Sequence, residues 1–254
     1  MLLSKLTDKI FKVKIKCSVV VVAAGSSQRF GEDKLFTPLM GIPVLAYSLM
    51  TLESSALVSE IIVVTAQQSI VPVAELCDKY AISKVTKVVC GGASRLESAL
   101  SGVSETDPHC SLIAIHDGAR PLMTKELLEN VINCAQKNKA AIPAVPAKET
   151  VKITAGGLIT STPDRAAAFN AQTPQVFLPE LIKGALTNAL EKNLIIYDDA
   201  SAVEDLGYPV YITNGSAENL KITSPLDLSM AELILKSRKL NGGKPAEAGG
   251  EKKQ

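Results

Sequence analysis

The chain has 254 residues, of which 46% are hydrophobic, and its 27 Lys and Arg nearly balance its 26 Asp and Glu. This length allows one large α/β domain, or a domain with a small sub-domain, built on a sizeable core. The formal net charge of +1 and the absence of Trp argue against a nucleic-acid partner, whether the contact is electrostatic or by base stacking. No apolar run approaches the roughly 18 residues of a membrane span, so no membrane partner is expected.

The two ends of the chain differ from its middle. Residues 1–16 alternate Lys with apolar residues and lack a cleavage site, so we interpret them as an N-terminal extension and not a signal peptide. Residues 239–254 are poor in apolar side chains and are predicted to be a disordered tail. Residues 17–238 are therefore expected to form the domain, within which 146–176 stand apart as described below.

The cysteines are scattered, no pair has the spacing of a zinc site, and there are only two His. Three of them lie at or beside strand-like runs and are predicted to be small core residues: Cys17, Cys90 and Cys110. This usage indicates a reducing compartment, the cytoplasm, or the plastid if the organism has one.

The first informative stretch is a Val19–Val22 strand that breaks into a loop. Four successive Val residues suit a strand covered on both faces, as in a parallel sheet. Three small residues follow and let the main chain approach a ligand: Ala23, Ala24 and Gly25. Arg29 and Lys34 add positive charge, so the loop suits phosphates. The alternative is an ordinary glycine turn of an α/β protein, because the loop matches neither the Walker nor the dinucleotide pattern.

Strands and helices then alternate at short spacing. We expect a helix after Pro43, a strand at 60–65, a helix near 69–79 and a strand at 87–90. Such alternation is typical of βα units around a mainly parallel sheet. The predicted fold class is α/β, a Rossmann-like twisted sheet flanked by helices.

A second glycine loop, Gly91–Gly92, follows a strand and precedes a helix with the apolar positions 96, 99, 100 and 103. Arg95, Ser98 and Gly102 share another face of that helix, so Arg95 and Ser98 can point at one ligand. The alternative is a glycine turn followed by a solvated Arg.

The third stretch is a buried strand ending in His116-Asp117-Gly118-Ala119-Arg120-Pro121. Ligands bind at the carboxyl ends of strands in open α/β sheets, and a carboxylate there, among phosphate-binding cations, suits Mg²⁺. The alternative is that Asp117 caps the next helix, although Thr124 is better placed for that. For His116 we favour a neutral structural role over a catalytic one.

After a strand at 140–145 the alternation stops, and residues 148–162 alternate polar and apolar side chains around Gly156–Gly157. This pattern predicts a two-stranded hairpin. Because an isolated hairpin is marginal in water, we expect residues 146–176 to form an arm that packs on a partner subunit.

The last third is expected to hold a helix at 179–191 and a final strand at 208–213. Lys221 lies in a short extended run just before a helix that starts with a capping box and Pro225. The apolar residues of this closing helix include Leu226, Met230, Leu233 and Ile234.

Several motifs occur together in one order: Ala23-Ala24-Gly25 with Arg29 and Lys34, Gly91-Gly92-x-x-Arg95-x-x-Ser98, His116-Asp117-x-Ala119-Arg120-Pro121, Gln172-Thr173-Pro174-Gln175-x-Phe177, Asp198-x-Ala200-Ser201 with Glu204, and Asn219-x-Lys221-Ile222-Thr223. From about Cys17 to Lys236 the chain resembles the 2-C-methyl-D-erythritol 4-phosphate cytidylyltransferases of the non-mevalonate isoprenoid pathway. The resemblance implies a nucleotidyltransferase homodimer with a protruding β-arm, which joins CTP to the methylerythritol phosphate with Mg²⁺ and releases pyrophosphate.

The resemblance also implies roles for individual residues. Five would hold the cytidine: Ala23, Ala24, Gly25, Gly92 and Ser98. Asp117 would bind the metal beside the nucleotide. Arg29, Lys34 and Lys221 would stabilise the α-phosphate during transfer. Thr150, Arg165 and Arg120 would grip the sugar phosphate, partly across the dimer.

Some positions depart from the family pattern. The gap from Arg29 to Lys34 is short, Ala93 stands where an acidic residue is frequent, and Tyr197 stands where Thr is common. Rival hypotheses are a cytidylyltransferase for another alcohol phosphate, such as ribitol 5-phosphate or a molybdopterin, and an inactive nucleotide-binding regulator.

Overall fold

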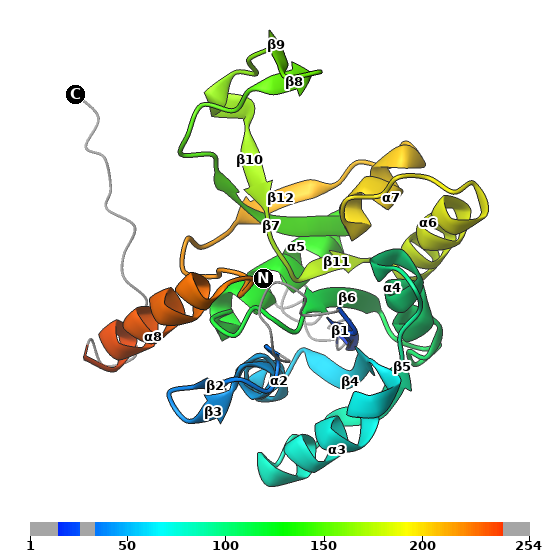
Figure 1. Ribbon diagram of the computed structural model, residues 1–254. Coiled ribbons are helices and arrows are strands. Elements are labelled where there is room, and N and C mark those ends of the chain that lie inside the picture. Colours follow the sequence, from blue (N-terminus) through cyan, green and yellow to red (C-terminus); the bar gives the residue numbers. More distant parts are fainter. Residues whose placement is uncertain (1–14, 26–33, 241–254) are drawn as a thin grey trace, which may run out of the picture.

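The computed structural model describes residues 15–25 and 34–240, which fold around one eight-stranded sheet (Figure 1). Across the sheet the strands run β10 (Phe169–Ala171), β7 (Ala140–Pro146), β11 (Gln175–Phe177), β6 (Leu112–Asp117), β1 (Cys17–Ala23), β4 (Val58–Thr65) and β5 (Val85–Cys90). An eighth strand, β12 (Tyr211–Asn214), pairs with β7. Most of the predicted N-terminal extension and of the predicted C-terminal tail lies outside the described residues.

The centre of the sheet is parallel, as the Val19–Val22 run predicts. Strand β1 pairs in parallel with β4 on one side and β6 on the other, and β4 pairs in parallel with β5. Val19, Val20 and Val21 are fully buried, because helices cover both faces. The carboxyl ends of these strands therefore lie along one edge of the sheet. The mainly parallel α/β fold is confirmed, with β10 and β11 running antiparallel to β7.

Two layers of helices enclose the sheet. On one face α4 (Arg95–Ser104), α6 (Pro179–Glu191) and α7 (Asp199–Asp205) pack together, and the other face carries α2 (Val44–Ser54), α3 (Ile70–Lys79) and α5 (Lys125–Asn138). The body also holds a short 3₁₀ turn at Gln67–Ser69 and the small β2 (Pro38–Leu39) and β3 (Ile42–Pro43) pair, and a second 3₁₀ turn, at Arg165–Ala167, lies in the arm. The helices expected near 69–79 and at 179–191 are present. No helix in the described part of the chain has the length and apolar character to cross a membrane.

Helix α4 lies close to the sheet because of one glycine. A Cβ on Gly102 would clash with the side chains of Val20 and Val64, so the face shared with Arg95 and Ser98 points partly into the core. By contrast, a Cβ on Gly184 of α6 would meet nothing within 4 Å.

These two glycines provide a matched test of packing. Alanine gains about 1 kcal/mol of helix propensity over glycine at either site, while overpacking at Gly102 costs about 1–3 kcal/mol. In denaturant titrations, Gly184→Ala is expected to have a higher free energy of unfolding than the wild type. The free energy of unfolding of Gly102→Ala is expected to be about 1–3 kcal/mol lower than that of Gly184→Ala. Equal stability of the two variants would contradict the close approach of α4.

The closing helix α8 (Pro225–Leu240) begins as predicted but buries a different face. The Asp227 carboxylate accepts hydrogen bonds from the backbone N–H groups of Thr223 and Ser224, both at 2.8 Å. Among the apolar residues named from the sequence, Ile234 packs against the core, but three are exposed: Leu226, Met230 and Leu233. The helix rests instead through Ala231 and its neighbours on a small cluster with Leu39, Val44, Leu122 and Ile222. It also ends at Leu240, two residues beyond the expected domain boundary at 238.

Strand β5 corrects one cysteine assignment. Cys17 and Cys110 are buried as predicted, but Cys90 is exposed because β5 pairs with β4 alone among the described strands and forms the edge of the sheet. The final strand, expected at 208–213, is observed as β12 from Tyr211 to Asn214.

The hairpin predicted beyond Pro146 projects from the body at the top of Figure 1. It consists of β8 (Ile153–Ala155) and β9 (Leu158–Ser161), joined by Gly156 and Gly157, whose positive φ angles of 57° and 84° suit glycine. These strands pair only with each other in the described chain. Their apolar side chains are open, with Leu158 75% and Ile159 62% exposed.

Candidate functional site

A cavity of about 360 Å³ opens at the carboxyl edge of the central strands. It is bordered by the ends of β1 and β6, the start of α4, and the segment before α8. Its lining residues are Val22, Ala23, Ala24, Gly25, Lys34, Leu35, Gly92, Ala93, Ser94, Arg95, Ser98, Asp117, Ala119 and Lys221. Strands that end side by side thus bring together three stretches that are distant in sequence.

The two small-residue loops meet at this cavity. A Cβ on Gly91 would lie 2.5 Å from the Cβ of Ala24, so the loops can approach this closely only without a side chain at Gly91. The Gly92 N–H donates to Ser98 Oγ at 3.2 Å, and that hydroxyl donates to the Ser94 carbonyl at 2.9 Å. Ser98 therefore holds the glycine loop in place as well as lining the cavity.

Asp117, at the end of β6, is the electrostatic centre of the site. Its carboxylate lies 3.1 Å from Lys221 Nζ, 3.3 Å from Arg120 Nε and 3.7 Å from an Arg95 nitrogen. Burial alone would raise the pKa of Asp117, but the charges of Lys221, Arg95 and Arg120 outweigh burial and hold the pKa well below its usual range. The group is an anion at any pH near neutrality.

Lys221 is fixed by the residue that follows it. Ile222 is fully buried and its N–H donates to the Ala119 carbonyl at 2.8 Å, which ties the segment before α8 to the loop after β6. Arg120 reinforces this junction, because its guanidinium donates to the Asn219 carbonyl at 2.8 Å. The ammonium group of Lys221 consequently reaches Asp117 from a constrained backbone.

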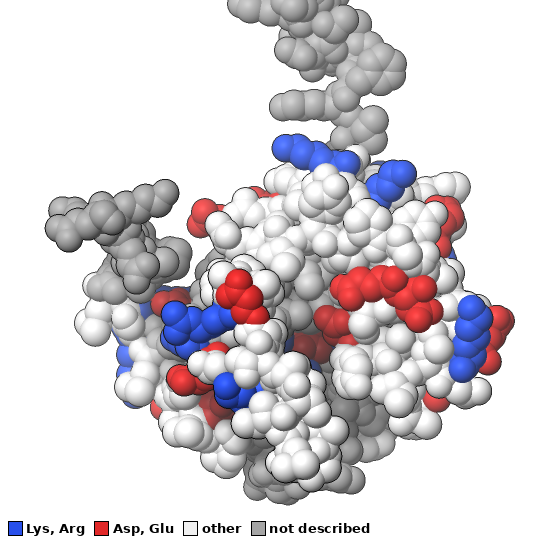
Figure 2. Space-filling model, turned by 90° about the horizontal axis from the view of Figure 1, so that it is seen from above, with Lys and Arg blue, Asp and Glu red and all other residues white. Residues whose placement is uncertain are grey.

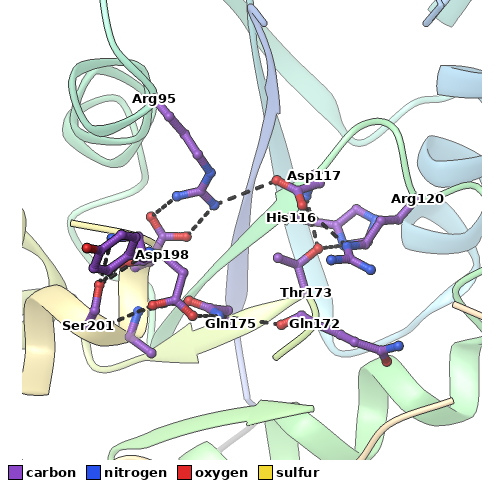
Figure 3. Close-up of polar contacts among 12 residues, drawn as sticks. Arg95, His116, Asp117, Arg120, Gln172, Thr173, Gln175, Asp198 and Ser201 are labelled. Carbon is purple, nitrogen blue, oxygen red and sulfur yellow. Dashed lines mark hydrogen bonds and ion pairs between the residues drawn. The ribbon is translucent and has the colours of Figure 1, made fainter. Parts of the chain in front are cut away.

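Arg95 faces Asp117 on one side (Figure 3) and is held from the opposite side by Asp199. The guanidinium makes two hydrogen bonds to the Asp199 carboxylate, at 2.9 and 2.7 Å, and Asp199 is only 1% exposed. Such a two-point contact fixes the plane of the guanidinium. Arg95 therefore lies between two carboxylates, with one edge facing the cavity.

Comparison with known proteins bears directly on this site. The family model for 2-C-methyl-D-erythritol 4-phosphate cytidylyltransferase matches residues 17–237. The chain belongs to this family.

Individual relatives agree with that assignment. The chain is 41% identical over 227 residues to the 2-C-methyl-D-erythritol 4-phosphate cytidylyltransferase of Caldanaerobacter subterraneus, covering 86% of this chain and 98% of the relative. It is 42% identical over 223 residues to the enzyme of the same name from Dehalococcoides mccartyi, covering 87% and 96%.

Two solved structures share the fold. The 4-diphosphocytidyl-2C-methyl-D-erythritol synthase of Anaerococcus prevotii aligns with a TM-score of 0.79 and 30% identity, covering 88% of this chain and 99% of that one. The 2-C-methyl-D-erythritol 4-phosphate cytidylyltransferase of Thermus thermophilus aligns with a TM-score of 0.72 and 30% identity, covering 87% and 100%.

Most of the residues to which the cytidylyltransferase resemblance assigns a role border the cavity. These are Ala23, Ala24, Gly25, Lys34, Gly92, Ser98, Asp117 and Lys221. Arg29 falls in 26–33, outside the described residues. Arg120 does not line the cavity and instead contacts Asp117 and the Asn219 carbonyl.

The two remaining candidates of the cytidylyltransferase pattern, Thr150 and Arg165, lie at the base of the arm. Both are exposed and neither lines the cavity. Thr150 or Arg165 can therefore contact the sugar phosphate, as predicted, only if the arm of one subunit approaches the cavity of another.

His116 does not face the cavity of this cytidylyltransferase family member. It is fully buried, and burial lowers the pKa of its imidazole to about 4, so the ring is neutral near pH 7. Its Nδ1 lies 3.1 Å from Thr173 Oγ1, and its Nε2 has no hydrogen-bond partner among the described residues. This agrees with the structural role expected for it.

Sequence reasoning missed Asp199 as a site residue. The pair Asp198-Asp199 opens α7, and Asp198 caps that helix, which hides the separate role of its neighbour. The Asp198-x-Ala200-Ser201 motif needs only one acidic residue to cap α7, so the second one, Asp199, was the signal that could have identified it.

Proposed function

We propose that this chain transfers CMP from CTP to 2-C-methyl-D-erythritol 4-phosphate, giving 4-diphosphocytidyl-2-C-methyl-D-erythritol and pyrophosphate, in isoprenoid precursor biosynthesis. The observation that carries the proposal is the convergence of Lys221, Arg95 and Arg120 on Asp117 at a cavity lined by two glycine loops. Family membership supplies the choice of substrates.

The proposed chemistry needs charge neutralisation and no general base. An oxygen of the sugar phosphate attacks the α-phosphorus of CTP, a new P–O bond forms, and the bond to the β-phosphate breaks with release of pyrophosphate. The nucleophile is already ionised, so no protein group must remove a proton. The neutral, buried His116 is therefore compatible with the reaction.

The cations of the cavity make this encounter of two anions possible. Lys34 and Lys221 line it and supply preorganised positive charge where the α-phosphate would react, and Arg29 is proposed to act with them. The small residues at the end of β1 and the Gly91–Gly92 loop would admit the cytidine against bare main chain.

Asp117 is suited to hold Mg²⁺. The described residues contain no group of three or more His, Cys, Asp or Glu side chains arranged for a metal, and the carboxylate among the described residues that line the cavity is Asp117. Mg²⁺ commonly binds through one or two carboxylates together with substrate phosphates. When bound, the ion would neutralise phosphate charge, and Asp117 would exchange part of its contact with Lys221 and Arg120 for it.

The arm gives the proposed homodimer its contact surface. Leu158 and Ile159 are exposed on a hairpin that has no other strand beside it in the described chain, and a second subunit would cover them. A partner's arm would also bring Thr150 and Arg165 to the sugar phosphate. The five cysteines are free, which suits the cytoplasmic setting that we propose.

The double variant Leu158→Asp with Ile159→Asp is expected to convert a dimer into a monomer in sedimentation velocity runs, because buried charges without partners oppose association. Ile195→Asp is the matched control, since Ile195 is 81% exposed on the body of the molecule and should leave the dimer intact. A wild-type monomer, or an unchanged dimer in the double variant, would contradict the proposed interface.

The activity is tested by pyrophosphate release with CTP and a panel of alcohol phosphates. We expect turnover with 2-C-methyl-D-erythritol 4-phosphate and little with ribitol 5-phosphate. Preference for another acceptor would replace the substrate assignment. CTP binding without pyrophosphate release from any acceptor would make the protein a nucleotide-binding regulator.

On the face of the molecule seen from above, the positively charged side chains are distributed in small groups. Figure 2 shows Lys and Arg side chains in small groups among Asp and Glu side chains around a central hollow. The described residues on this face present no continuous basic surface, in keeping with the net charge of +1. A small anionic substrate fits such a distribution better than a nucleic acid.

A further inference from the structure

The turn that follows β10 and runs into the first residue of β11, Gln172-Thr173-Pro174-Gln175, contacts three separate walls of the site without lining the cavity itself. Gln172, Thr173 and Gln175 are 7%, 4% and 1% exposed. Thr173 reaches the end of β6 and Gln175 reaches the start of α7 (Figure 3). Gln172 reaches the segment that leads to Lys221. The mechanism above assigns none of them a role.

Gln172 holds the segment that leads to Lys221. Its amide nitrogen donates to the Ser216 carbonyl at 2.8 Å, and its amide oxygen accepts from the Ser216 N–H at 3.1 Å. Asn219 donates to the same oxygen at 3.4 Å and to the Thr173 carbonyl at 3.0 Å. The backbone just before Lys221 is thus fixed to the turn.

Thr173 holds Asp117. The Asp117 N–H donates to Thr173 Oγ1 at 3.1 Å, and the same hydroxyl lies 3.1 Å from His116 Nδ1. The residue that carries the central carboxylate is therefore bound to the turn through its own backbone, and the neutral His116 completes the contact.

Gln175 holds the start of α7, and through it Arg95. Its amide nitrogen donates to Asp198 Oδ2 at 2.8 Å, and its amide oxygen accepts from the Ala200 N–H at 2.8 Å. Asp199 lies between these two contacts and makes the two-point contact with Arg95. The orientation of Arg95 consequently depends on Gln175, which acts through the start of α7 and Asp199.

We propose that the Gln172–Gln175 turn is the positioning unit of the site, setting Lys221, Asp117 and Arg95 in register through three branches, two of which share Asn219. Displacing a reacting group by about 1 Å can cost on the order of 10²-fold in rate, so the loss of one branch should lower kcat. This inference rests on the proposed CMP transfer, because it predicts how that rate responds to the turn.

A double-variant cycle tests the Gln175 branch. Gln175→Leu is expected to lower kcat about tenfold and Arg95→Ala about 10²-fold, with the KM for CTP changing less than either. If Gln175 acts through Arg95, the combined variant should be no slower than Arg95→Ala alone. A loss that multiplies in the combined variant would overturn this branch.

Two conservative substitutions at Thr173 test the Thr173 branch, and this test remains valid even if Gln175→Leu does not fold. Thr173→Val keeps the shape of the side chain but removes the acceptor for the Asp117 N–H, and should lower kcat about tenfold. Thr173→Ser restores the hydroxyl and should return kcat to within threefold of the wild type. Equal kcat values for the Val and Ser variants would overturn this branch.

The controls separate positioning from general loss of stability. Gln136→Leu makes the same replacement at an exposed position of α5 and should leave kcat unchanged. All assays are run well below the melting temperature of each variant. Absence of wild-type turnover would overturn the proposed function, whereas wild-type turnover with unchanged kcat in Gln175→Leu and Thr173→Val would overturn only the positioning unit.

Discussion

Asp117→Asn is expected to lower the turnover of CMP transfer by about 10²–10³-fold, the size of effect seen when one preorganised electrostatic group is removed from an active site. The carboxylate is the point on which Lys221, Arg120 and Arg95 converge, and it is the group proposed to hold Mg²⁺. The measurement is steady-state pyrophosphate release at saturating CTP and sugar phosphate.

The same variant should change CTP binding in the opposite direction when metal is absent. Removing the negative charge leaves Lys221 and Arg120 without their carboxylate partner, while Arg95 keeps Asp199, so CTP should bind several-fold more tightly in EDTA than it does to the wild type. Asp78→Asn, at an exposed position of α3, is the control and should change neither quantity. Turnover within threefold of wild type would contradict the central place of Asp117.

Lys34→Ala is expected to keep the fold and to lose about 10²–10³-fold in turnover. Lys34 is half-buried at the cavity and follows the first glycine loop, where its charge would face the α-phosphate. Because it lies at the rim and not in the core, the melting temperature should stay close to that of the wild type.

The control for this variant is Lys192→Ala, which removes an exposed lysine at the end of α6. It should leave turnover and melting temperature unchanged. Near-normal turnover in Lys34→Ala would count strongly against the proposed site.

Local patterns were enough to predict the centre of the fold and most of the cavity. The Val19–Val22 run identified a strand buried on both faces, and parallel strands end at one edge, so the residues just after β1, β5 and β6 had to be neighbours. That reasoning places Ala24, Gly92 and Asp117 together, and the structure does the same.

Contacts between distant segments were beyond the reach of the same patterns. Arg95 and Asp199 are 104 positions apart, and their pairing depends on how α6 packs against both α4 and α7. Nor does periodicity show that β11 inserts antiparallel between β6 and β7, which is what brings Thr173 to Asp117.

The closing helix shows a second limit of periodicity. Helix α8 has apolar residues on more than one face, and the cluster formed by Leu39, Val44, Leu122 and Ile222 decides which face is buried. Leu226, Met230 and Leu233 are left exposed as a result. Tertiary packing, which a single helix does not encode, selects between such faces.

A crystal structure of this protein with CTP and Mg²⁺ tests the central claim most directly. We predict that the triphosphate occupies the cavity, with its α-phosphate beside Lys34 and Lys221 and the metal ion on Asp117. A triphosphate bound elsewhere, with Asp117 still paired only to Lys221, Arg120 and Arg95, would contradict it.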